Sequence, residues 1–297
     1  MGIKTLSSFI QRNCKKGYNE ISISKLSGKT IAIDVLIYIY LFKGSNALYE
    51  NMFKMCNIFI KYNITPIFVF DGNTPEEKKD EVEKRYIRKN NEEKKIKEIK
   101  KKLNSNELTL IEKIKYEKEM VELKKNSTRL NKNIVEDIKT IINSCGMKYV
   151  IAPYEAETLC VYWTKIGKVY ATMSNDSDLF AYGCPRILKY IHLNSENITL
   201  YDFETILSCL NITYDVFTTL CVMSEGDYNS NAKTFDEIYK DRNNIDYKIT
   251  HNNNKIYNDN INKLDKEYYK NYKIEKTNNY NINDIKDVLK KEGFIFI

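Results

Sequence analysis

Two short apolar segments, each ending on an aspartate, constrain the fold of this chain more than any other feature. Residues 29–34 (KTIAID) and 64–71 (ITPIFVFD) have the length and the continuous apolar character of buried strands. Between them, residues 46–62 carry apolar side chains at helical spacing. A strand, a helix and a second strand in that order predict parallel strands in an α/β sheet.

The same pattern recurs in the second half of the chain. Residues 147–152 and 168–173 predict two more strands, with a helix over residues 154–166 between them. We therefore expect a central, mostly parallel sheet flanked by helices.

Acidic side chains follow the ends of these predicted strands repeatedly. One acidic pair alone is weak support for a site, because surface loops often hold such pairs, but ligands of open α/β sheets bind just beyond the carboxyl ends of strands. Carboxylates gathered in apolar surroundings repel one another unless cations neutralise them. Oxygen ligands favour Mg²⁺, or Mn²⁺ in its place, and two such ions suit phosphodiester hydrolysis. The candidate metal ligands are Asp34, Asp71, Glu155, Glu157, Asp176, Asp178 and Asp227.

The composition narrows the chemistry further. The chain has two histidines, His192 and His251, and seven cysteines without a CxxC pair. Histidine-based acid–base chemistry, nucleophilic triads, zinc sites and disulfide frameworks are therefore not expected, which leaves carboxylates and metal ions. No apolar run approaches the ~18 residues of a membrane helix, and the first residues lack a signal-peptide pattern. We expect an intracellular protein without membrane association.

A long charged segment carries most of the net positive charge. Residues 76–133 contain 19 Lys/Arg against 13 Asp/Glu, a difference of +6 out of the +7 of the whole chain. The surrounding residues 75–145 predict two long helices with a break near residues 104–106. A solvated helical face is one interpretation and a surface for phosphates is the other. Residues 243–283, rich in Asn, Lys, Tyr and Ile, predict a loose low-complexity insertion.

Five segments carry a resemblance to a known family. MGIKTL, IAIDVLIYIY, PIFVFDGNTP, APYEAET and GKVYATMSNDSDLFAYGCP resemble, in order and spacing, the structure-specific 5′ nuclease family of flap endonucleases, 5′–3′ exonucleases and an excision-repair nuclease. The similarity covers residues 1–42 and 64–228. It implies a PIN-like fold with a nuclease core over residues 1–228, a protruding basic helical arch over residues 75–135, and a reduced helical C-terminal region over residues 229–297.

The resemblance also implies roles for individual residues. The seven acids match the ligands of two metal ions. Lys78 and Arg85, on one helix face, match arch cations that contact the scissile phosphate, Lys as a point charge and Arg as a bidentate fork. Gly2, Tyr40 and Arg88 match DNA contacts, with Tyr40 stacking on a nucleobase. A tyrosine of the core is the alternative for Tyr40.

Three departures from the family pattern predict a compact, divergent member. Glu225 stands where the family has a glycine, two residues before Asp227. The following residues lack the glycine-rich turn that contacts duplex DNA and a potassium ion in the family, and no sliding-clamp motif is recognisable.

The function expected is that of a monomeric 5′ flap endonuclease, which cuts branched or 5′-flapped DNA by a two-metal mechanism. A 5′–3′ exonuclease of the same family is an alternative, because the acids are shared. A catalytically inactive DNA-binding scaffold is an alternative from another class, against which the complete acid set argues. A small-domain ribonuclease fits less well, because such domains lack the arch. The expected location is the nucleus or a site of DNA replication, or a cytoplasmic factory for a viral protein.

Overall fold

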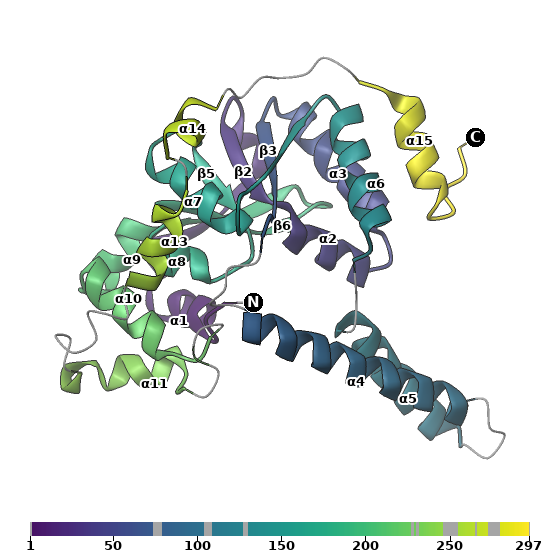
Figure 1. Cartoon of the computed structure of the whole chain (residues 1–297), viewed down its shortest axis with the longest axis horizontal. Helices are drawn as coiled ribbons and strands as arrows, with labels where there is room; N and C mark the ends of the chain where they lie inside the picture. The colour runs from purple at the N-terminus through teal and green to yellow at the C-terminus, as the bar shows by residue number, and fades with distance from the viewer. Residues whose placement is uncertain are drawn as a thin grey trace.

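The computed structural model describes residues 2–73, 79–103, 109–126, 130–226, 229, 232–245, 255–264, 266–272 and 280–296. In this part of the chain the strands form one seven-stranded sheet in the order β1-β7-β6-β5-β2-β3-β4 (Figure 1). The five strands from β6 to β4 run parallel, whereas β7 is antiparallel to both β6 and β1. The mostly parallel sheet expected from the sequence is therefore confirmed. The strands are β1 (Tyr18–Ser22), β2 (Thr30–Asp34), β3 (Thr65–Phe70), β4 (Lys148–Ile151), β5 (Ala171–Met173), β6 (Arg186–His192) and β7 (Asn197–Asp202).

Alternate side chains of the central strands enter two separate hydrophobic cores. In β2, Ile31 and Ile33 belong to one core, and Ala32 belongs to the other. The core around Ala32 is covered by α1 (Leu6–Asn13), α7 (Ala156–Lys165), α8 (Asp178–Ala181), α9 (Phe203–Leu210), α10 (Tyr214–Met223) and α11 (Phe235–Lys240). The opposite core is covered by α2 (Val35–Gly44), α3 (Leu48–Lys61), α6 (Lys132–Ser144) and α15 (Ile282–Lys290). Burial on both faces explains why these strands have continuous apolar sequences.

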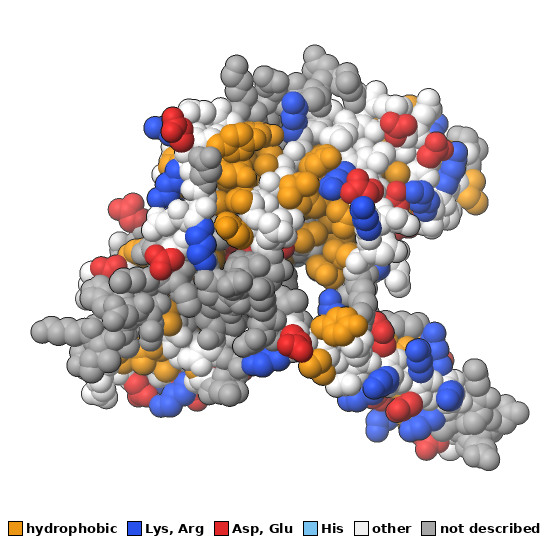
Figure 2. Space-filling model, in the orientation of Figure 1, with side chains coloured by type: hydrophobic (Ala, Val, Ile, Leu, Met, Phe, Trp, Pro, Cys, Tyr) orange, Lys and Arg blue, Asp and Glu red, His pale blue; other side chains and the backbone are white. Residues whose placement is uncertain are grey.

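A two-helix hairpin projects away from the sheet (Figure 1). It consists of α4 (Lys79–Leu103) and α5 (Leu110–Asn126), which pack against each other. Ile96 and Ile99 of α4 are buried there, at 8% and 5% exposure. Most of the other described side chains of α4 face solvent, and Figure 2 shows Lys and Arg along the hairpin. The sequence predicted two long helices over residues 75–145, but the structure has three helices in this range, because α6 is separate from the hairpin.

The C-terminal segments return to the core instead of leaving it. The short helices α13 (Lys255–Asn262) and α14 (Lys266–Asn271) lie beside α7, where Trp163 Nε1 donates a hydrogen bond of 2.9 Å to the carbonyl of Tyr269. Helix α15 packs on α3 and α6. The described parts of the asparagine-rich stretch thus contain docked helices, although parts of that stretch lie outside the described residues.

Three short 3₁₀ helices complete the secondary structure of the described chain: η1 (Lys15–Gly17), η2 (Ile23–Leu26) and η4 (Arg242–Asn244). Among the described helices, none is long and apolar enough by itself to cross a membrane. The pair α9 and α10, bent by 86°, would meet the length and composition requirements jointly.

Candidate metal centre and nucleic-acid interface

Four of the predicted acids lie at the carboxyl ends of four neighbouring parallel strands. Asp34 is the last residue of β2, Asp71 directly follows β3, Glu155 lies between β4 and α7, and Asp176 follows β5. Since β5, β2, β3 and β4 are consecutive in the sheet, segments far apart in the sequence meet at this edge.

Asp34 lies in acidic surroundings. It is 7% exposed, and burial raises its pKa well above the ordinary value of 3.8. The nearby negative charges of Asp71, Asp176 and Glu155 raise this pKa further. A hydrogen bond of 2.9 Å from the Ser174 hydroxyl to Asp34 Oδ2 opposes the rise in part. The structure therefore brings four of the seven predicted acids within electrostatic reach of one another.

The amino terminus of α7 is connected to Asp71 by a hydrogen bond, and its first turn contains another of the predicted acids. The backbone N–H of Ala156 donates a hydrogen bond of 2.7 Å to Asp71 Oδ1, which ties the end of β3 to this helix. Glu157 lies in the first turn of α7 and is buried, at 7% exposure. The backbone N–H groups in the first turn of a helix have no acceptor within that helix, so carboxylates are favoured near them.

The acidic loop between β5 and α8 contains Asp176 and ends at Asp178, the first residue of α8. The backbone N–H of Asp178 donates to Asp176 Oδ1 at 3.0 Å, and the N–H of Asp176 donates to Ser174 Oγ at 3.1 Å. The N–H of Ile3 donates to Asp178 Oδ1 at 3.1 Å, while Ser177 Oγ donates to the carbonyl of Ile3 at 2.9 Å. The amino-terminal backbone thus holds this acidic loop from outside the sheet.

Gly2 lies directly against the same loop. Its φ angle is +76°, and a Cβ atom built on it would lie 2.1 Å from Asp176 Oδ1 and 2.6 Å from Asp178 Oδ1. A side chain at this position therefore collides with both carboxylates. The sequence predicted Gly2 near the DNA, and the structure places it against the acids.

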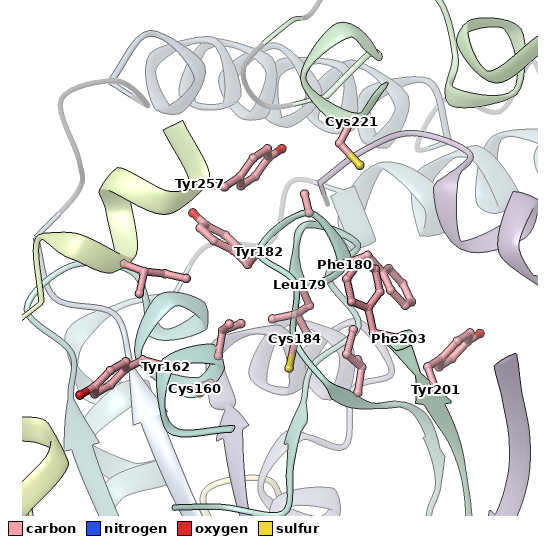
Figure 3. Packing of buried hydrophobic residues seen from close by; sticks show 14 of the residues in the cluster. Cys160, Tyr162, Leu179, Phe180, Tyr182, Cys184, Tyr201, Phe203, Cys221 and Tyr257 are labelled. Carbon is pink, nitrogen blue, oxygen red and sulfur yellow. The ribbon is translucent and has the colours of Figure 1, made fainter. Parts of the chain in front are cut away.

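Apolar residues that follow Asp178 fix the loop to the core (Figure 3). Leu179 and Phe180 are fully buried, and the Phe180 ring packs on Tyr201 and Phe203 at centroid distances of 5.4 Å and 6.4 Å. This packing compensates for the burial of Asp178, which is 1% exposed.

Lys189 is a site residue that the sequence analysis missed. It is fully buried in β6, and its ammonium group donates to the carbonyl of Asp176 at 3.1 Å and to Ser7 Oγ at 2.9 Å. Burial lowers its pKa to about 8, against the opposing effect of the charges of Asp176 and Asp178. A single lysine at a buried position of the apolar strand RILKYIH was the available signal.

The predicted DNA contacts lie in and near the hairpin. Tyr40 on α2 is half-buried, and Lys89 Nζ of α4 lies 4.9 Å from its ring centroid, so Tyr40 is not enclosed in the core. Arg88 is exposed and lines a surface hollow of about 430 Å³ between α4 and Leu123 of α5. Arg85 lies on α4, with its side chain outside the described residues. Lys78 and Asp227 also lie outside the described part of the chain.

The described acids do not form a closed ligand cage. Within the described ranges, no group of three or more His, Cys, Asp or Glu side chains is placed to hold one metal ion as the side chains stand. Mg²⁺ keeps several water ligands and is often bound through only one or two carboxylates. The oxygen donors and mutual repulsion around Asp34 therefore fit a hydrated divalent ion.

Comparison with protein families and relatives agrees with this arrangement. The XPG N-terminal domain matches residues 1–92 and the XPG I-region matches residues 146–227. Flap endonuclease 1 of Glycine max is 31% identical over 247 residues, and that of Saccharomyces cerevisiae (strain YJM789) is 30% identical over 247 residues. The chain belongs to the structure-specific 5′ nuclease family. These alignments cover 77% of this chain and 62% and 61% of the relatives, so the chain spans less than two thirds of their length.

Solved structures of the 5′ nuclease family share the fold. The catalytic core of Rad2 in complex with DNA substrate has a TM-score of 0.59 at 19% identity, over 100% of this chain and 82% of that one. Flap endonuclease-1 from Methanococcus jannaschii has a TM-score of 0.58 at 24% identity, over 93% and 95%. At these identities the similarity establishes the PIN-like 5′-nuclease fold alone.

The two matched family regions contain every candidate residue named from the sequence. Residues 93–145, which include most of the hairpin, and residues 228–297 lie outside both regions. The acidic edge therefore lies within the matched regions, whereas most of the hairpin and the C-terminal segments lie outside them.

Proposed function

We propose that this chain is a metal-dependent 5′ flap endonuclease that hydrolyses phosphodiester bonds in branched DNA. The observation that carries the proposal is the convergence of Asp34, Asp71, Glu155 and Asp176 at one sheet edge, where the negative charges of the other three raise the pKa of Asp34. A packing role does not explain carboxylates gathered against one another, because their repulsion destabilises the folded chain.

The residues that would hold two Mg²⁺ ions are the seven acids from Asp34 to Asp227, with Mn²⁺ as a substitute. When bound, such ions activate water and stabilise negative charge on the leaving oxygen. The chain itself positions the carboxylates. The Ser174 hydroxyl donates a hydrogen bond to Asp34, and the backbone N–H of Ile3 donates one to Asp178. Lys189 brings one buried positive charge to the acidic loop.

The hairpin and α2 would bind the DNA. In this proposal Lys78 and Arg85 contact the scissile phosphate, and Arg88 contacts the backbone. Tyr40, exposed in part beside Lys89, would stack on a nucleobase. Branched DNA is also the kind of partner that the family relationship favours, and a monomer acting inside the cell remains our expectation.

A cleavage assay on matched DNA substrates tests the proposal. End-labelled 5′-flap, nicked, gapped and blunt duplexes are incubated with the full chain and Mg²⁺, with Asp178→Asn as the inactive control. We expect one cut at the base of the flap, absent without Mg²⁺ and in Asp178→Asn. Binding of Asp178→Asn to the flap should equal or exceed that of the unchanged chain, because phosphate repulsion falls.

The other outcomes separate the alternatives. Stepwise release of short products from nicked or blunt ends would show a 5′–3′ exonuclease. Binding without cleavage of any substrate would show a catalytically inactive scaffold and overturn the proposal.

A further inference from the structure

Tyr38 on α2 carries a buried polar group that the fold leaves unused. The residue is 0% exposed, and its ring packs near Phe42 at a centroid distance of 6.1 Å. Its hydroxyl oxygen is inaccessible to solvent and makes no hydrogen bond in the structure. A buried hydroxyl without a hydrogen bond destabilises the folded state, and a phenylalanine would fill the same space without that loss.

Two other fully buried tyrosines in the described chain are hydrogen-bonded. Tyr201 accepts a hydrogen bond of 2.9 Å from Gln11 Nε2, and Tyr182 accepts one of 3.3 Å from Asn260 Nδ2. The fold can therefore satisfy a buried phenol elsewhere, and the hydroxyl of Tyr38 requires a separate explanation.

The position of Tyr38 points to Asp34. Asp34 is the residue directly before α2, in extended backbone, and Tyr38 is the fourth residue of that helix, about one turn further along. Long helical side chains also lean toward the amino terminus, which is the direction of Asp34. Burial raises the pKa of the Tyr38 hydroxyl well above its ordinary value, and the negative charge of Asp34 is the second cause. The hydroxyl is thus within electrostatic reach of the acid without a hydrogen bond to it.

We propose that Tyr38 is a positioning residue whose hydroxyl donates a hydrogen bond to Asp34, directly or through one water molecule, when a divalent cation occupies the acidic site. This inference rests on the proposed function, because it requires that Asp34 binds a cation. Ser174 holds Asp34 Oδ2 from the end of β5, and Tyr38 would add a donor from α2. Hydrogen bonds to an ionised carboxylate are about twice as strong as neutral ones, so the bond forms at the loaded site. Partners that orient metal ligands in this way typically change metal affinity by about 10–100-fold.

Tyr38→Phe separates this role from a structural one, because it removes only the hydroxyl oxygen. The matched control is Tyr201→Phe, which removes a hydroxyl that has a partner. For both variants and the unchanged full chain, Mn²⁺ affinity is measured by titration calorimetry and thermal unfolding is measured in EDTA. We expect Tyr38→Phe to bind Mn²⁺ about tenfold more weakly, with its Tm in EDTA unchanged or raised by about 2–4 °C. Tyr201→Phe should lower the Tm in EDTA and leave the Mn²⁺ affinity within about twofold.

Each remaining outcome overturns the inference or its foundation. An unchanged Mn²⁺ affinity in Tyr38→Phe would show that the hydroxyl does not act on the site. A weaker affinity accompanied by a lower Tm in EDTA would show general damage to the fold. If the unchanged chain binds no Mn²⁺, the proposed metal site itself is wrong. This result differs from a failure of the Tyr38 inference, because it is seen in the chain without any substitution.

Discussion

Glu292 accepts a hydrogen bond of 2.9 Å from the backbone N–H of Tyr49, although the two residues are 243 positions apart. Its other carboxylate oxygen accepts one of 2.9 Å from the N–H of Leu48. Both donors belong to the first turn of α3, where no residue of the same helix supplies an acceptor. A residue near the end of the described chain thus caps a helix that covers the central sheet.

Glu292→Ala should therefore destabilise the whole core and not only the C-terminal helix. Loss of a helix cap lowers the unfolding free energy by about 1–2 kcal/mol. Urea unfolding followed by circular dichroism measures the change. Asp287→Ala, at an exposed position of α15, is the control and should leave the unfolding transition in place. Equal transitions for both variants would contradict the capping role.

Gly2→Ala should impair cleavage far more than it impairs stability. The new Cβ lies 2.1 Å from Asp176 Oδ1 and displaces the acidic loop, and displacement of catalytic groups by about 1 Å can cost about 10²-fold in rate. Steady-state cleavage of a flap substrate checks this. Gly28→Ala is a matched control, since Gly28 has a similar φ of +72° but no atom within 4 Å of the added Cβ. It should keep its activity, and a similar activity loss in both variants would point to backbone strain instead of the collision.

Asp34→Asn should stabilise the metal-free protein, and more at high pH than at low pH. The folded-state pKa of Asp34 is raised above 3.8, so the folded chain keeps this proton to a higher pH than the unfolded chain. The stability linked to this group is fully present below pH 3.8 and is lost as the pH rises through the raised pKa. Asparagine does not ionise, so the variant does not lose this stability as the pH rises. Thermal unfolding in EDTA at pH 5 and pH 8 measures it, with Asp287→Asn as the control. A gain in Tm of equal size at both pH values would refute the electrostatic explanation.

Arg88→Ala should weaken DNA binding by way of the phosphate backbone. Arg88 is exposed on the projecting hairpin, so we expect affinity to fall on flap DNAs of any sequence. The slope of log affinity against log salt should become shallower by about 1, as for loss of one phosphate contact. Fluorescence anisotropy over a salt series provides the measurement. Lys25→Ala removes an equal charge at the exposed η2 turn, and it should leave the slope unchanged. Equal changes of this slope in the two variants would show that Arg88 acts only through the net charge of the protein.

Four of the five parallel strands could be predicted, and the clearest of them, β2 and β3, are buried on both faces. The segments ending at Asp34 and Asp71 are continuously apolar, and their order along the chain forces a parallel arrangement. Strands β1, β6 and β7 were not predicted. The side chains of β1 and β7 are only partly buried, with many polar residues, and in β6 a lysine interrupts the apolar residues.

The position of several acids at the ends of strands could be predicted, whereas the groups that contact them could not. Asp34, Asp71 and Asp176 follow strands, and strand ends are visible in sequence. Lys189 and Tyr38 lie in segments whose apolar pattern conceals them, and their significance depends on what the folded chain places beside them. The contact between Glu292 and Tyr49 is of the same kind, because nothing local to either residue specifies the other.

The hairpin α4–α5 is inserted between β3 and β4, which are hydrogen-bonded neighbours in the sheet. The chain therefore leaves the sheet from β3 and returns to it at the neighbouring strand β4, whatever the length of the segment between them. Lengthening such a connection costs little, because each doubling of a flexible loop adds only about 0.6 kcal/mol of closure entropy. Insertion or deletion can thus remodel the hairpin, which we propose binds DNA, without altering the strand register that aligns the carboxylates. The proposed DNA-binding part and the acidic edge can therefore evolve separately in this architecture.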